Sequence, residues 1–217
     1  MSKQAVKTLE VSVPEMRSFG IADLRAADEG SFIIGHPVVY GQKTSVCDLF
    51  HEVIERGALD NCDFGDVVFS INHDGRRIPL ARSRRNNSGS TMQVGVDEKG
   101  LFIKADMDIE NNADAKSLYS AVKREDVSGM SFVFFIGEER WEGLDTDMPV
   151  RHIQRISKIL EVSAVNHPAY DGTDINARGT FMLDNAAKVL EHARIKPEDP
   201  EKQIEMEKLK TQILMKG

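Results

Sequence analysis

The chain has 217 residues, of which 41% are hydrophobic and 29% are charged, as in a soluble protein with one core and some length left for tails. No apolar run approaches the roughly 18–20 residues that span a bilayer, and residues 1–6 lack the apolar core of a secretory signal. The cysteines, Cys47 and Cys62, are too few for a disulfide framework and fit a reducing cytoplasm. The net charge of −7 argues against nucleic-acid binding, which needs a basic surface.

In chain order, residues 1–30 mix charges with short apolar pairs and predict an N-terminal arm or a weak strand entering the domain. Runs of β-forming residues bounded by turn residues then predict a series of strands. These strands are expected at 31–40, 67–75, 91–96 and 101–107, the last two joined as a hairpin by residues 97–100. Residues 48–54 fit either a strand or a short helix.

The clearest helical pattern covers residues 113–124, where apolar side chains recur at helical spacing and Asn112 can cap the N-terminus. Gly129 then turns the chain into an apolar strand at 129–135. An acidic loop is expected at 138–148. A strand pair, 151–157 and 159–165, follows it.

From residue 184 onward helix formers and charges dominate, which predicts two short amphipathic helices in a tail. We therefore expect an arm at 1–30, a main domain at 31–180 and a helical tail at 181–217. Many short strands with one good interior helix indicate an α+β fold, a β-rich barrel-like sheet with flanking helices.

Ser131 is the hydroxyl in the apolar strand 129–135. A serine in such a strand is most often a small core residue bonded to the backbone. It can instead be a nucleophile held on a rigid scaffold, if a base and an orienting acid lie elsewhere in the chain.

His73 is the histidine best placed to be that base. It ends the apolar strand at 67–75 and is expected to continue the face of Phe69 and Ile71, beside a turn that leaves it accessible. The alternative is a structural histidine that caps the turn.

Glu161 is the notable acid, because it interrupts the apolar run 159–165 and a buried carboxylate needs a partner. Arg151 or Arg155 would be an ordinary partner, and the Nδ1–H of His73 would be a catalytic one. Asp74 and Asp106 are weaker candidates for the same role.

Four segments, in this order and at similar spacing, resemble the serine protease family that matures tailed-phage proheads. They are 52–59, 72–74 with 78–82, 129–132, and 160–165 with 168–169, and the hairpin end 99–101 also matches. Each motif alone is weak, but the ordered set over residues 30–178 is specific. The family resembles the herpesvirus assembly protease (assemblin) in fold, a β-barrel that works with serine and histidine.

This resemblance implies that Ser131 is the nucleophile, His73 the general base and Glu161 the third member. We expect backbone N–H groups of Asn166, His167 or Ala169, in the turn after the Glu161 strand, to stabilise the oxyanion; Pro168 has no N–H to give. Neither a metal nor a cofactor is expected.

The resemblance predicts a prohead maturation protease that cleaves scaffold, capsid-protein extensions and itself inside the assembling prohead, in the host cytoplasm. Its partners would be scaffold and major capsid protein, with no membrane or nucleic acid, and assembly into a homo-oligomer is left open. The alternative is a non-catalytic capsid-assembly protein that keeps the fold and binds scaffold helices through residues 204–213.

Other signals have simpler explanations. His51, Glu52 and Glu55 would approach metal-ligand spacing only on a helix. Cys62 sits in a polar turn, which does not favour a thiol nucleophile. The arginines of residues 76–85 are expected on a solvated loop, with a grip on acidic scaffold or packaged nucleic acid as the alternative.

Overall fold

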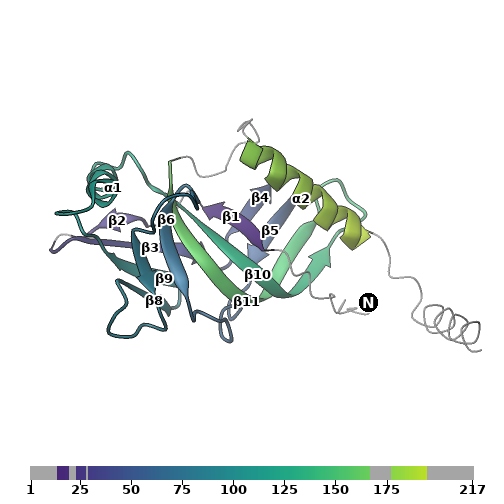
Figure 1. The fold of residues 1–217 in the computed structure, drawn as a ribbon. Coiled ribbons are helices and arrows are strands. Elements are labelled where there is room, and N and C mark those ends of the chain that lie inside the picture. The colour runs from purple at the N-terminus through teal and green to yellow at the C-terminus, as the bar shows by residue number, and fades with distance from the viewer. Residues whose placement is uncertain (1–13, 20–22, 28, 167–176, 195–217) are drawn as a thin grey trace, which may run out of the picture.

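The computed structural model of the protein describes residues 14–19, 23–27, 29–166 and 177–194. The described chain is α+β, with two sheets and two helices (Figure 1). Neither of these helices is long and apolar enough to cross a bilayer.

The larger sheet carries the residues of the candidate site. Its strands run in the order β1-β10-β11-β5-β4, and β6 joins it beside β11, with β7 beyond β6. Its members are β1 (Glu15–Phe19), β4 (Lys43–Val46), β5 (Phe50–Ile54), β6 (Val67–Ile71), β7 (Ala81–Ser83), β10 (Gly129–Glu142) and β11 (Val150–Val165). Both β5 and β6 pair with β11 in parallel, at its two ends, so β11 connects most of the sheet.

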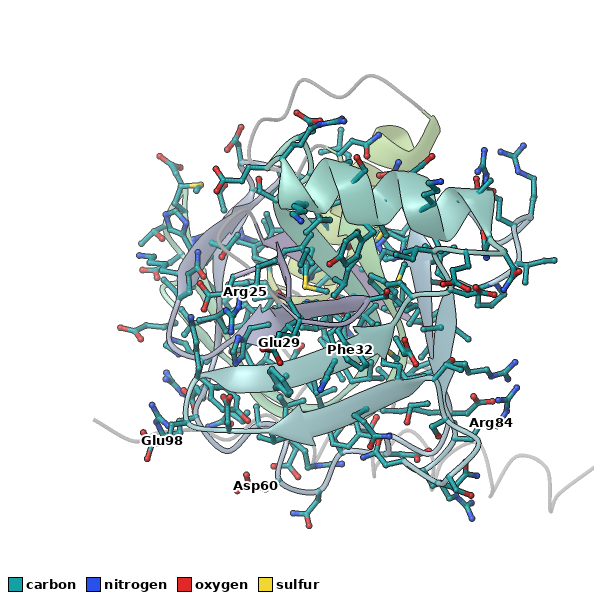
Figure 2. The ribbon with its side chains drawn as sticks, turned by 90° about the vertical axis from the view of Figure 1, so that its left-hand side faces the viewer. Arg25, Glu29, Phe32, Asp60, Arg84 and Glu98 are labelled. Carbon is teal, nitrogen blue, oxygen red and sulfur yellow. The ribbon has the colours of Figure 1, made fainter. Side chains whose placement is uncertain are left out.

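The smaller sheet has the order β2-β3-β9-β8, built from β2 (Arg25–Ala26), β3 (Phe32–Val39), β8 (Met92–Val96) and β9 (Gly100–Asp106). Figure 2 views this sheet with α1 lying across the molecule above it. Fully buried side chains of both sheets, including Ile103 and Phe132, form one continuous core. That shared core holds the two sheets together.

Helix α1 (Ala113–Lys123) begins where the sequence predicts. The Asn112 side chain accepts from the backbone N–H groups of Asp114 and Ala115, and Leu118 is among the buried residues of its apolar stripe. Helix α2 (Ala177–Arg194) packs Ala186 and Leu190 against β4 and β5, over which it lies in Figure 1.

The predicted strands at 31–40, 91–96 and 101–107 are confirmed as β3, β8 and β9, and residues 50–54 form a strand. Two expectations were wrong. The loop expected at 138–148 is strand β10 as far as Glu142, and the two strands expected between 151 and 165 are one strand, β11. Strands β10 and β11 form one long pair, and register shifts between Val133 and Glu139 of β10 let this pair bend without a break. The polar residues from 138 to 142 therefore do not mark a turn.

The expected barrel-like sheet is also corrected, because the two described sheets are not closed into a barrel. Within residues 1–30, the part that the structure describes includes β1, which pairs with β10, and β2, which pairs with β3. The division of the chain at residues 30 and 180 stays a prediction, and the helix expected around residues 204–213 lies outside the described residues.

Candidate active site

Three serines lie side by side on one face of the larger sheet. Ser131 on β10 is in register with Ser163 on β11, which is in register with Ser70 on β6. Strand alternation turns the neighbouring Met130 and Phe132 to the opposite face, where they are fully buried in the core. The apolar neighbours thereby fix the Ser131 backbone, and Ser131 itself is 0% exposed.

His73 reaches this row of serines from the turn that follows β6. Both Asn72 and His73 adopt left-handed backbone conformations, with φ of 51° and 53°, and β6 itself ends at Ile71. The expectation that His73 continues the face of Phe69 and Ile71 was therefore wrong, because the turn breaks the alternation. The ring Nε2 lies 2.5 Å from Ser131 Oγ, and the backbone N–H donates to Ser163 Oγ at 3.3 Å.

Glu161 on β11 holds the other side of the imidazole ring. Its Oε1 lies 2.9 Å from His73 Nδ1, and it accepts from the hydroxyls of Ser70 at 2.5 Å and Ser163 at 2.8 Å. Burial opposes ionisation of this carboxyl, but the bonds from His73, Ser70 and Ser163 outweigh it, and the pKa of Glu161 lies below its usual value. An ionised Glu161 keeps the proton on Nδ1, which leaves Nε2 to accept from Ser131.

The alternative partners of Glu161 are engaged elsewhere. Arg155 bonds Glu138 at 3.2 Å, and Arg151 bonds carboxylates at the opposite end of β11. Asp74 pairs with Arg76. Asp106 is an exposed residue of the smaller sheet. Among the sequence candidates, the structure thus brings together Ser131, His73 and Glu161.

The turn expected to supply the oxyanion donors is described only at its first residue. The Asn166 N–H donates to the side-chain oxygen of Asn72 at 3.0 Å, so this amide is already engaged. His167 and Ala169 lie outside the described residues.

Sequence reasoning missed two groups of residues at the site. Ser70 and Ser163 share Glu161 with His73. Each is a hydroxyl in an otherwise apolar run, which was the sequence signal that could have found them. The second group is β1, since the carbonyl oxygen of Arg17, 2.8 Å from Ser131 Oγ, is an alternative acceptor to His73 Nε2 for the one hydroxyl proton. No pattern in residues 15–19 indicates this neighbour.

The remaining candidates do not form a second site in the described part of the chain. His51 and Glu52 lie on a strand and not on a helix, and no group of three metal-ligating side chains was found among the described residues. Burial raises the pKa of the Cys62 thiol to about 12, which disfavours a thiolate. In the basic loop, Arg77 pairs with Asp114 across to α1.

A family model described as caudovirus prohead serine protease matches residues 21–188. No curated protein matches the chain, and no solved structure does either. The family match covers most of the chain, including the row of serines, His73 and Glu161. The chain therefore belongs to the caudovirus prohead serine protease family, the serine peptidases of phage head maturation in the assembling procapsid.

Proposed function

We propose that the protein is a prohead maturation endopeptidase in which Ser131 is the nucleophile, His73 the general base and Glu161 the residue that orients the base. The observation that carries this proposal is the unbroken hydrogen-bond chain from Glu161 Oε1 through both His73 ring nitrogens to Ser131 Oγ. A nucleophile, a base and an orienting acid at these distances are what acyl transfer from a peptide requires.

In the proposed reaction, Ser131 Oγ attacks a peptide carbonyl carbon as its proton passes to His73 Nε2. The tetrahedral intermediate then breaks its C–N bond, and the same proton goes to the leaving amine. Water, deprotonated by His73, attacks the acyl-enzyme ester, and the proton returns to Ser131 as the product acid leaves. Glu161 stabilises the imidazolium formed in each half of the reaction without taking its proton.

The developing oxyanion needs backbone donors, each worth about 3 kcal/mol of transition-state stabilisation. We assign this role to the turn 166–169, through the amides of His167 or Ala169, or through Asn166 if it releases Asn72. Residues 166–169 follow β11 in the sequence and begin three positions after Ser163, which is in register with Ser131.

The proposed substrates are scaffold and capsid-protein extensions, together with the chain itself, cleaved inside the prohead in the host cytoplasm. A fold related to assemblin and association into a homo-oligomer belong to the same proposal. The resemblance of this family to assemblin in fold supports the first of these, and the activation by association that is common among viral proteases of that fold supports the second.

The test is co-expression of the full chain with the scaffold and major capsid protein of its own phage. We expect the wild type to process scaffold, and Ser131→Ala and His73→Ala to leave it at full length while keeping the wild-type circular dichroism. Scaffold processing by folded Ser131→Ala would refute the assignment. Unprocessed scaffold with the wild type and with both variants would favour the alternative, a non-catalytic assembly protein. The complete burial of Ser131 also agrees with that alternative.

A further inference from the structure

Strand β1 lies against β10 at the proposed nucleophile. It pairs antiparallel with β10, so that Ser18 is in register with Ser131 and Arg17 with Phe132. Because Ser131 Oγ donates to the Arg17 carbonyl oxygen at 2.8 Å, the peptide bond from Arg17 to Ser18 is the one that faces the nucleophile. An extended peptide added to the edge of a sheet is a common way for a protein to bind a peptide.

The side chain before this peptide bond enters a carboxylate site. Arg17 makes a two-point contact with Glu52 of β5, from Nε to Oε1 at 2.7 Å and from a terminal nitrogen to Oε2 at 2.9 Å. Its guanidinium also lies 5.9 Å from the centre of the Phe134 ring. Glu52 is 4% exposed, so the site is shielded from water. Paired contacts of this kind favour arginine over a neutral side chain.

A second site of opposite charge receives the residue two positions earlier. Both carboxylate oxygens of Glu15 accept from Arg151 of β11, at 2.8 and 2.9 Å. Arg151 is 3% exposed and also bonds Glu139. The body of the protein thus offers a carboxylate and a guanidinium at the spacing of two residues on an extended strand.

We propose that the edge of β10 beside Ser131 binds the substrate, and that β1 occupies this edge as a built-in substrate mimic. Glu52 selects a basic residue just before the scissile bond. Arg151 selects an acidic residue two positions earlier. This inference rests on the proposed function and names the substrate class of the same site.

The contact with β1 also explains how the nucleophile is restrained. Ser131 has one hydroxyl proton, and its two acceptors are His73 Nε2 and the Arg17 carbonyl oxygen. While the proton is donated to Arg17, the base does not activate the hydroxyl, and β1 keeps other peptides from the buried Ser131. Release of β1 exposes the nucleophile together with both charged sites.

The first test loosens β1 with the double variant Glu15→Ala/Arg17→Ala and follows labelling of Ser131 by a fluorophosphonate. We expect labelling to accelerate about tenfold or more, because the accessible state becomes more populated. The matched control is Arg25→Ala/Glu29→Ala, which removes the same two charge types at exposed positions, labelled in Figure 2. The control should be labelled within about twofold of the wild type.

If the double variant does not fold, Arg17→Gln with hydrogen exchange of the β1 amides replaces it. We then expect faster exchange at residues 16–18 and faster labelling together. Equal labelling of wild type and of folded variants with a loosened β1 would overturn this inference and leave the proposed function standing. No labelling of any variant would overturn the proposed function and this inference with it.

The second test measures the cleavage specificity of the Arg17→Gln variant, in which β1 is loosened. Its substrates are fluorescence-quenched peptides that contain Glu-Met-Arg-Ser-Phe or Glu-Met-Gln-Ser-Phe. We expect kcat/KM to be about tenfold to hundredfold higher for the arginine peptide, the effect of a hydrogen-bonded charge pair. Adding Glu52→Gln should abolish this preference, because the carboxylate that bonds the arginine is lost. Equal kcat/KM values for the two peptides with the Arg17→Gln variant, in which Glu52 is intact, would contradict the selection of a basic residue.

Discussion

At the scale of single residues, His73 is held on three sides. Glu161 bonds Nδ1, Ser131 faces Nε2, and Ser163 accepts from the backbone N–H. The left-handed turn that brings the ring there places Asn72 and His73 in a region that non-glycine residues seldom occupy. Such backbone strain persists only where surrounding contacts enforce it, as these three do.

Glu161→Gln should keep the fold and lower kcat by about 10³- to 10⁴-fold in an enzyme whose β1 has been loosened. The reason is that a neutral amide no longer fixes the proton on His73 Nδ1. The measurement is peptide hydrolysis in the Arg17→Gln background. Glu138→Gln is the control, since that exposed carboxylate bonds Arg155 away from the site. A loss smaller than about tenfold would rule out an orienting role for Glu161.

Ser70→Ala should raise the pKa of Glu161 towards its usual value, because a hydrogen bond to the charged form is removed. A pH titration followed by NMR of carboxyl-labelled glutamate measures the change.

Ser45→Ala serves as the control for this titration, since Ser45 bonds the exposed Asp48. An unchanged Glu161 titration in Ser70→Ala would mean that Ser70 does not stabilise the carboxylate.

At the scale of elements, the hairpin of β8 and β9 shows how one position fixes a sheet. Gly100 has a φ of 152°, and a Cβ added there would lie 2.0 Å from the Val38 carbonyl oxygen on β3. Only glycine allows the two backbones to approach this closely.

Gly100→Ala should therefore destabilise the protein by about 3 kcal/mol or more, through strain and separation of β3 from β9. Urea denaturation measures the free energy of unfolding. Gly95→Ala on β8 is the matched control, because a Cβ there meets nothing within 4 Å. Equal stability of the two variants would contradict the close approach.

Local patterns predicted some elements well and others poorly. Helix α1 carries its cap and its apolar stripe within its own sequence, so its limits were predictable. The lengths of β10 and β11 depend on bulges and on pairing between distant residues, which no local pattern contains. In the site, Ser131, His73 and Glu161 are singled out by their places in or beside apolar strands, and the resemblance implies their roles. Strand β1 was missed because the partners of its charges, such as Glu52, are far away in sequence.

At the scale of the whole molecule, one buried ionic cluster joins the N-terminal strand to three other strands of the larger sheet. Arg17 and Glu15 of β1 meet Glu52 of β5, Arg151 of β11 and Glu139 of β10. Burial raises the pKa of Glu15, but Arg17 and Arg151 outweigh it and lower that pKa to about 2. The docking of β1 is thus linked to pH.

A carboxyl with a depressed pKa stabilises the native state above its unfolded pKa, and this contribution is lost as pH falls through the folded value. For Glu15, a change from 4.5 to about 2 corresponds to roughly 3 kcal/mol, lost progressively between these two pH values. Urea denaturation across that range should show a flatter pH dependence for Glu15→Gln than for wild type. Parallel curves would contradict a stabilising, ionised Glu15.

The assignment of Ser131 and His73 is tested most directly by the site and rate of covalent labelling by a fluorophosphonate, read by mass spectrometry of the intact chain and its peptides. We expect one adduct, on Ser131, formed by wild type and faster by Glu15→Ala/Arg17→Ala. We expect Ser131→Ala and His73→Ala to form none. An adduct on another residue, or labelling of Ser131 that is unchanged by His73→Ala, would contradict these roles.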